Sequence, residues 1–403
     1  MELFWLEHKK LWRKKIVKIC VLLCFVYYVI FGSILLFQWF GFGSSDDYTS
    51  AFGNNFDGYT VIKDSQEYAL SFGGELTDET LQQIVSDYQQ MEADGMEEEL
   101  EKTDWQIVNS WLGTLYPELR DTSNYKTMIS YVDPDKLTGF YERRQQVLDE
   151  FLEISGQVGA EKEFLHQMER KVEKPFHYEW VEGWSTLLGS MVADLGVVMA
   201  LFLGIVLSSL FAGEWHDNTS ALVLTTRNGW GKIALAKILT GFAFTVELFA
   251  LLAVSSIISQ LFFMGTAGWD MPIQNIKLIA VAPMNMLQAE IYEYAFVLLG
   301  AIGFAGIVMF ISAAVKNNVL TLLLSLAVVY GPMMIAEYLP YGMQKALDLI
   351  PLAGSSTDIF RTNTFRIFGK LIWSPYLLIT IPVLIGILCM PFAIKSWSRR
   401  MKA

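Results

Sequence analysis

Charged residues are scarce in this sequence, and most of them lie in one segment. They make up 18% of the 403 residues, whereas a soluble domain carries about a quarter. Outside the segment from Ser44 to Ser185, the chain consists mainly of long apolar runs. This shortage of charge excludes an ordinary soluble protein and predicts an α-helical polytopic membrane protein.

Cysteine, histidine and catalytic motifs are also scarce. The three cysteines, Cys20, Cys24 and Cys389, lie in apolar runs, so the charged segment is not a disulfide scaffold. The four histidines are scattered, and the sequence has no H-E-x-x-H motif, no C-x-x-C motif and no G-x-x-x-x-G-K-S/T phosphate loop. We therefore expect no catalytic residues, no metal site and no cofactor in this chain itself.

The sign of the charge divides the chain. Residues 44–185 contain 30 acidic and 11 basic residues, and the remainder contains 12 acidic and 19 basic residues. Nucleic-acid binding requires a basic face, so we expect no nucleic-acid partner. In the acidic segment, Leu81, Val85 and Tyr88 recur at helical spacing, and Asp135 is expected to cap a later helix. We predict that this segment is a mostly helical domain.

Six apolar segments are long enough to cross a hydrocarbon core of about 30 Å as helices. Their approximate bounds are Ile16–Phe40, Thr186–Ala212, Ile233–Phe263, Ala295–Val315, Asn317–Ala336 and Leu371–Ile394. The first is too long for a cleaved signal peptide, so it is expected to remain as an anchor. In the fourth, Gly300, Gly303 and Gly306 predict close helix packing.

Basic residues indicate the direction of the spans. They precede the first span, follow the sixth, and occur at Arg227, Lys232 and Lys316 between spans. The positive-inside rule places such residues in the cytoplasm. We therefore predict two cytoplasmic termini and this division: a cytoplasmic amphipathic helix over 1–15, the first transmembrane helix over 16–43, an extracellular domain over 44–185, and a five-helix transmembrane region over 186–403.

The connection between the second and third spans, residues 213–232, carries the most informative motif. An acidic and an aromatic residue, Glu214-Trp215, lead into a short apolar stretch, which an arginine ends and a lysine of the next span follows. The matching positions are Glu214, Trp215, Thr219, Leu222, Leu224, Arg227 and Lys237. With the six spans and the N-terminal helix, this pattern resembles the type-2 ABC exporter permease family. Asn218 stands where that family usually has glycine, and the proline often found before the arginine is absent.

The large domain between the first two spans resembles a Gram-positive subset of that family. The resemblance implies the transmembrane subunit of an ATP-driven exporter in the bacterial cell membrane, which moves an amphiphilic, peptide, drug or lipid-like substrate outward. ATP and Mg²⁺ would bind a separate ABC ATPase, and a second copy or a related permease would complete the complex within the lipid. The residues expected to couple to the ATPase are Glu214, Trp215, Asp217, Thr219, Leu222, Leu224, Arg227 and Lys232.

Two carboxylates interrupt the predicted spans, Asp194 in the second and Glu247 in the third. Charged residues in a bilayer are costly and usually face a cavity or the protein interior. We therefore interpret Asp194 and Glu247 as lining the substrate path or a dimer seam. A hydrogen-bonded pair that only fixes helix packing is an equal alternative. Glu290 and Glu293, which lie before the fourth span, are expected to be solvated near the outer surface.

Two other classes of function stay open from the sequence. In one, the chain is a membrane sensor or immunity protein whose extracellular domain captures a peptide, and it transports nothing. In the other, the chain is a secondary transporter driven by ions, with Asp194 and Glu247 as the proton or cation site.

Overall fold

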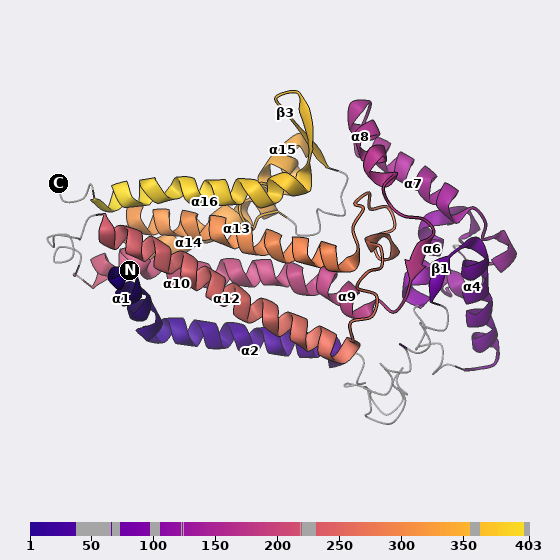
Figure 1. The fold of residues 1–403 in the computed structure, drawn as a ribbon, viewed down its shortest axis with the longest axis horizontal. Helices are drawn as coiled ribbons and strands as arrows, with labels where there is room; N and C mark the ends of the chain where they lie inside the picture. The colour runs from indigo at the N-terminus through magenta and orange to yellow at the C-terminus, as the bar shows by residue number, and fades with distance from the viewer. Residues whose placement is uncertain are drawn as a thin grey trace.

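The computed structural model describes residues 1–37, 66, 73–96, 105–121, 123, 125–217, 219, 231–354 and 363–398. Figure 1 shows a bundle of long helices lying side by side, with a smaller domain attached at one end. The N-terminal helix and the end of the last helix lie at the opposite end of the bundle. We call these two ends the domain end and the termini end.

Five helices in the described part of the chain are long and apolar enough to cross a membrane. They are α10 (Val192–His216), α12 (Lys232–Met264), α13 (Met286–Ala314), α14 (Asn318–Ile335) and α16 (Ser374–Ser398). At the domain end, α9 (Glu182–Thr186) and a π-helical turn η4 (Leu187–Met191) extend α10. The protein is therefore a helical multi-pass membrane protein, in which each helix satisfies its own backbone hydrogen bonds.

The predicted first span corresponds to helix α2 (Lys15–Phe37), which packs against α12 and α10. Before it lies α1 (Glu2–Arg13), the amphipathic helix that the sequence predicted. The backbone turns at Lys14, which is extended, so α1 and α2 run in different directions (Figure 1). Residues 38–43 of the predicted span lie outside the described residues.

Two helices begin at places that the apolar runs did not indicate. Helix α13 begins at Met286, not near Ala295, because Asn285 and Gln288 form a capping box that satisfies its first backbone groups. Helix α16 begins at Ser374, not near Leu371. A hairpin of β3 (Thr364–Ile367) and β4 (Lys370–Trp373) precedes it.

Helices α13 and α16 approach each other closely at glycine residues, as the sequence predicted. A Cβ atom at Gly303 would collide with the backbone of Pro382, and one at Gly306 with Gly386. Small residues permit this backbone approach in membrane bundles, where dispersion contacts replace the hydrophobic effect as the main attraction.

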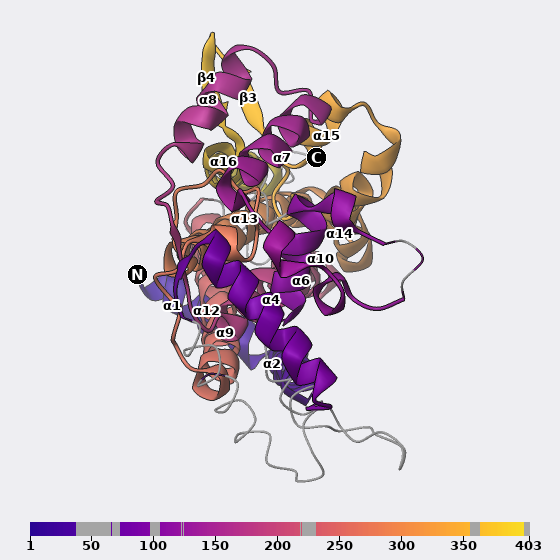
Figure 2. The same cartoon turned by 90° about the vertical axis from the view of Figure 1, so that its right-hand side faces the viewer.

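The smaller domain is mostly helical, and Figure 2 shows its helices from the domain end. Its elements are α4 (Asp78–Ala93), α6 (Trp105–Leu115), α7 (Phe140–Ile154) and α8 (Ala160–Glu169), the short turns η1 (Pro117–Leu119), η2 (Met128–Ser130) and η3 (Pro134–Lys136), and the antiparallel pair β1 (Gly74–Leu76) and β2 (Phe176–Tyr178). Trp111, Phe140 and Phe176 pack edge to face in its core.

The predicted cap of the third helix is wrong. Asp135 lies within η3, and α7 begins at Phe140. The carboxylate of Asp78 accepts hydrogen bonds from the backbone N–H groups of Gly139 (2.7 Å) and Phe140 (2.9 Å). A residue 61 positions earlier in the chain therefore satisfies the start of this helix.

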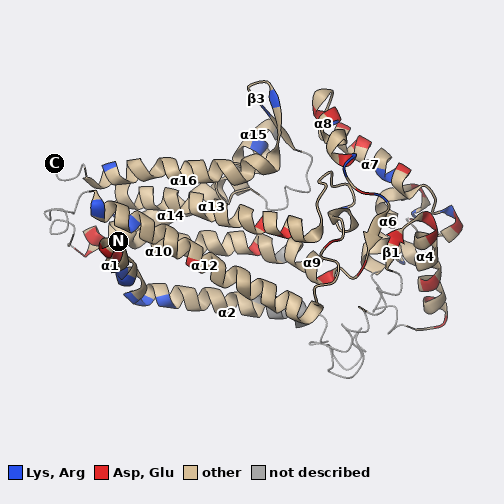
Figure 3. Ribbon diagram, in the orientation of Figure 1, with Lys and Arg blue, Asp and Glu red and all other residues tan. Residues whose placement is uncertain are grey.

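Charge is arranged along the long axis of the molecule. Figure 3 shows Lys and Arg gathered at the termini end of the bundle, whereas Asp and Glu are frequent in the smaller domain.

The other connections at the domain end contain η5 (Ile273–Asn275), η6 (Ala336–Tyr338) and α15 (Tyr341–Leu347). The segment predicted to couple to a motor therefore begins at the basic end of the bundle, together with α1 and the end of α16.

Candidate functional site

A buried ion pair joins the two helices that flank the predicted coupling segment. Glu214 lies in the last turn of α10 and Lys237 in the second turn of α12. Their exposed fractions are only 5% and 2%, and Lys237 Nζ lies 2.8 Å from Glu214 Oε1. The ion pair therefore closes the connection between α10 and α12 at its base.

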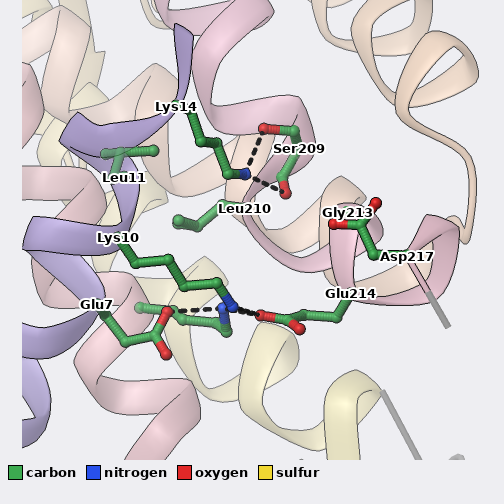
Figure 4. A pocket seen from close by; sticks show the side chains of 10 residues that line it. Glu7, Lys10, Leu11, Lys14, Ser209, Leu210, Gly213, Glu214 and Asp217 are labelled. Atoms are coloured by element: carbon green, nitrogen blue, oxygen red, sulfur yellow. Dashed lines mark hydrogen bonds and ion pairs between the residues drawn. The ribbon is translucent and has the colours of Figure 1, made fainter. Parts of the chain in front are cut away.

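Helix α1 adds a second layer of charge to this pair, shown in Figure 4. Lys10 Nζ donates to Glu214 Oε1 at 2.5 Å, and Lys237 Nζ donates to Glu7 Oε2 at 2.8 Å. Lys14 Nζ donates to Ser209 Oγ at 3.2 Å, one turn before Glu214 on α10. Positive and negative groups therefore alternate across α1, α10 and α12, which is the arrangement that makes buried charge tolerable.

The pKa values of Lys10 in α1 and of Lys14, which follows that helix, are shifted in opposite directions. Burial by itself lowers the pKa of Lys10, but the hydrogen bond and the negative charge of Glu214 outweigh it, so that the pKa is raised above its usual value. Burial, together with the positive charges of Lys237 and Lys10, lowers the pKa of Lys14. A cavity of about 20 Å³ lies among these side chains, which is room for about one water molecule.

At the termini end, Trp215 contacts α16 and the turn between α13 and α14. Its ring lies 6.2 Å from that of Trp397 near the end of α16, and Trp397 in turn lies 5.5 Å from Phe211. The ammonium group of Lys316, in the turn between α13 and α14, lies 4.4 Å above the Trp215 ring. This cation–π contact and the ring contacts connect the start of the coupling segment to the second half of the bundle.

The predicted coupling residues fall into three groups. Glu214 and Trp215 are buried or half-buried and hold the framework, so a partner does not reach the Glu214 carboxylate directly. Asp217, Thr219 and Lys232 are exposed, and the Thr219 hydroxyl donates to Glu214. The other three, Leu222, Leu224 and Arg227, lie outside the described residues.

Sequence reasoning missed the part that α1 has in this site. Lys10 was counted only among the basic residues that precede the first span, and Glu7 was not singled out. Their partners Lys237 and Glu214 lie 230 and 204 residues away in the chain. The available signal was the i,i+3 spacing of Glu7 and Lys10, which places charges of opposite sign on one side of α1.

Glu247 also holds α1. Its Oε1 lies 3.1 Å from His8 Nε2, and its Oε2 accepts a hydrogen bond from Trp12 Nε1 at 3.0 Å. The Trp12 ring lies 5.7 Å from that of Phe244, one turn before Glu247 on α12. Helix α1 is thus fastened to α12 at Lys237 and again at Glu247.

Asp194 has different neighbours. It lies in the first turn of α10, and its Oδ1 accepts a hydrogen bond from the Tyr27 hydroxyl of α2 at 3.0 Å. No hydrogen bond or ion pair among the described residues joins Asp194 to Glu247. The two carboxylates that the sequence paired therefore contact different elements.

Glu290 and Glu293 are not solvated, which corrects the expectation from the sequence. Both lie in the first two turns of α13, and their exposed fractions are 4% and 0%. Neither carboxyl oxygen of Glu293 has a hydrogen-bond partner among the described residues, whereas the Glu290 carboxyl group faces the Tyr294 hydroxyl. Tyr294 lies close enough to interact electrostatically with both, and its hydroxyl is 2.5 Å from Ser256 Oγ. Carboxyl groups are rare inside membrane helices and usually mark a pathway for a substrate or an ion.

Comparison with protein families, with characterised proteins and with solved structures found no match for this chain. Among the described residues, no three histidine, cysteine, aspartate or glutamate side chains are grouped so as to hold a metal ion.

Proposed function

We propose that the protein is the transmembrane subunit of an ATP-driven exporter. The observation that supports this proposal is the junction of α10 and α12. The ion pair of Glu214 and Lys237 joins the two helices, and Glu7 of α1 also pairs with Lys237. A motor that pushes on a loop moves a membrane helix only if the loop is joined rigidly to that helix. Here the connecting segment emerges from a base of paired charges and closely packed aromatic rings.

The same junction supplies a route for movement. Helix α10 packs against α13 and α14, and α13 packs against α16 through the glycine contacts. A displacement of the Glu214 end of α10 is therefore passed to the core of the bundle, because packed interiors shift between discrete arrangements and do not deform continuously. In this scheme, α1 prevents the ends of α10 and α12 from separating under load.

The remaining features of the proposal follow from this assignment. Helix α2 is the first of six spans, the termini end faces the cytoplasm of a bacterial cell, and the smaller domain is extracellular. An ABC ATPase that binds ATP and Mg²⁺ contacts the segment from Asp217 to Lys232. A second copy or a related permease completes the complex in the membrane. The basic residues at the termini end support this orientation.

Co-purification with an ABC ATPase tests the proposal. The wild-type chain, affinity-purified from the membranes of its native cells, is expected to retain an ABC ATPase. Leu222→Asp combined with Leu224→Asp should abolish retention, since apolar contacts at a partner groove are lost. The matched control is Ile154→Asp with Val158→Asp, two exposed apolar residues of the smaller domain. Loss of retention in the control, or retention by the Leu222/Leu224 variant, would contradict the proposal.

Ion-driven transport is a second candidate, favoured by Glu290 and Glu293. Buried carboxyl groups in a membrane helix are typical of proton relays. The two candidates differ in their energy source. Proteoliposomes that contain the purified chain alone should move no substrate under an imposed proton gradient if the exporter proposal holds. Transport under that gradient without ATP would favour the second candidate.

A further inference from the structure

The hairpin of β3 and β4 stands at the edge of the bundle, where α16 begins. Among the described residues, its two strands pair only with each other. Figures 1 and 2 both show it projecting sideways from the domain end of α16, across the long axis of the bundle. A single two-stranded hairpin is at best marginally stable in water, so its surroundings decide whether this one persists.

The length of α16 places the hairpin at the surface of the membrane. The helix has 25 residues and is about 37 Å long at a rise of 1.5 Å per residue. The hydrocarbon core is about 30 Å thick, so each end of α16 reaches only a short way into the headgroup region. Strand β4 ends at Trp373, the residue before α16. A hairpin that leaves this point sideways therefore lies along the bilayer, at the level of the headgroups.

One side of the hairpin is polar and faces the smaller domain. Side chains alternate between the two sides along each strand. On this side, the Thr364 hydroxyl donates to Gln157 Oε1 at 3.2 Å, and Arg366 Nη2 lies 3.9 Å from Glu161 Oε1. Gln157 lies in the turn between α7 and α8, and Glu161 lies in α8. The domain therefore covers this side.

The opposite side is mainly apolar and faces the membrane. Phe365 lies opposite Ile372 in the register of the hairpin, and Ile367 lies opposite Lys370. Residues paired in this way share one side, which here is the side away from Thr364 and its polar contacts. Its three apolar side chains are half-buried, and its lysine is exposed. Figure 1 shows α8 beyond the hairpin as seen from the bundle, so the apolar side is turned back toward the lipid.

The tip of the hairpin carries a fully exposed aromatic ring. The exposed fraction of Phe368 is 102%. With Gly369 it forms a two-residue turn in which both residues have positive φ, 49° and 79°. Asparagine, aspartate or glycine suits the first position of such a turn, and a bulky side chain there is unusual. The turn therefore gives no reason for phenylalanine, whereas a membrane surface does, because aromatic rings are favoured at the headgroup level.

We propose that this hairpin is an interfacial anchor, which binds the phospholipid surface at the domain end of the bundle. Phe368 and the apolar side enter the boundary between headgroups and acyl chains, and the Lys370 ammonium group pairs with lipid phosphate. The anchor continues the lipid-facing surface of α16, on which Leu384 and Leu388 are exposed. Through its polar side it also holds the smaller domain against the membrane. This inference goes beyond the proposed export function and requires only that the chain spans a membrane.

Spin labelling of the full chain tests the anchor. The three native cysteines are replaced by alanine, Phe368→Cys carries a nitroxide, and single copies are placed in nanodiscs of phosphatidylcholine and phosphatidylglycerol. Oxygen, which concentrates in lipid, and a water-soluble nickel chelate then compete to relax the label. The ratio of oxygen to nickel accessibility should be at least about threefold higher than for Tyr125→Cys, an equally exposed aromatic position of the smaller domain.

A substitution that suits the turn provides a second measurement. Phe368→Asn favours the positive φ, so a hairpin held by its turn alone would exchange its amide hydrogens more slowly. An anchored hairpin should exchange them about tenfold faster in the same nanodiscs, because the contact of the ring with lipid is lost. Phe368→Trp retains an aromatic ring and should exchange as wild type does. The β1–β2 pair of the smaller domain is the internal reference.

Three results would overturn the anchor. The first is equal accessibility ratios at positions 368 and 125, which would place the hairpin in water. The second is slower exchange in the Phe368→Asn variant. The third is a label at 368 that is shielded only in vesicles where spin–spin broadening shows two copies in contact, since a second copy of the chain would then cover the hairpin. The measurements contain no ATPase, so their failure is separate from a failure of the co-purification test.

Discussion

Lys237 Nζ lies 2.8 Å from Glu214 Oε1 in a setting where both side chains are at most 5% exposed. Glu214 lies at the start of the segment predicted to receive force and Lys237 lies beyond its end, in α12, 23 positions further along the chain. Removing two charges from water is costly, and their attraction offsets that cost only when the geometry and the additional hydrogen bonds are good. Lys10, Glu7 and Thr219 supply those additional bonds.

Lys237→Met is expected to lower the free energy of unfolding by about 3–5 kcal/mol, because it leaves a buried carboxylate without its main partner. Denaturant unfolding in mixed micelles measures this change. Lys232→Met, which removes an exposed charge on the same helix, serves as the control and should stay within about 0.5 kcal/mol of wild type. If Glu214→Gln and Lys237→Met were additive in the double variant, the two side chains would not be coupled.

Chemical labelling should report the altered pKa of Lys10. Only a neutral amine is acylated, and Glu214 raises the pKa of Lys10, so its acylation at pH about 9 should be slower in wild type than in the Glu214→Gln variant. The stabilisation from a raised lysine pKa is complete below the unfolded value and is lost as the pH rises through the folded value. The difference in rate should therefore disappear at higher pH.

Mass spectrometry of the Lys10 peptide after brief acylation across a pH series measures these rates. Lys171 lies at the other end of the molecule and provides the reference, since its rate should be the same in both proteins. Identical Lys10 rates in wild type and in the Glu214→Gln variant at every pH would show that this ion pair is absent in the membrane.

Glu247→Gln should loosen α1 without unfolding the bundle. The variant loses the charge that faces His8 and weakens the acceptor for Trp12. We expect hydrogen exchange of the α1 amides to become about tenfold faster, which corresponds to about 1.4 kcal/mol for a hydrogen bond to a charged group. Exchange in α16 is the internal control. If α1 exchange is unchanged while transport is lost, Glu247 acts on the substrate path as the sequence suggested.

Gly306→Leu is expected to separate α13 from α16. Any side chain at this position meets the backbone of Gly386, which cannot move aside as a flexible side chain would. The variant should lower the thermal midpoint of the detergent-solubilised protein by more than about 5 °C, which for a chain of 403 residues is more than about 2 kcal/mol. Gly331→Leu on α14 is the matched control, since a Cβ there meets nothing within 4 Å. A similar loss in both variants would show that the contact with Gly386 is not its cause.

The sequence was sufficient for the elements whose signal is local. Helix α1 (Glu2–Arg13) lies within residues 1–15, where an amphipathic helix was predicted, and five apolar runs correspond to the five long helices. Length and hydropathy determine such helices because hydrocarbon leaves the backbone no other way to satisfy its hydrogen bonds.

Features that depend on distant residues were not predictable. Asp78 caps α7 from 61 positions away, and Glu7 pairs with Lys237 across 230 positions. Glu290 and Glu293 were misplaced for a different reason. Carboxylates end an apolar run in any hydropathy count, so the run appeared to begin after them. Only the three-dimensional packing shows that the helix continues through them and buries both.

The burial of Glu293 leads to a prediction in which stability and function change in opposite directions. Its two oxygens are fully buried and have no hydrogen-bond partner among the described residues. Replacing an unsatisfied polar group by an apolar one of similar shape removes its desolvation cost, so Glu293→Met should stabilise the protein by about 1–3 kcal/mol. Proteins retain such costly groups where function requires them, so the same variant should lose most of its transport. Denaturant unfolding and export by cells that express the variant measure the two effects, with Leu287→Met as a conservative control on the same helix. A variant that is both more stable and fully active would show that Glu293 has no part in transport.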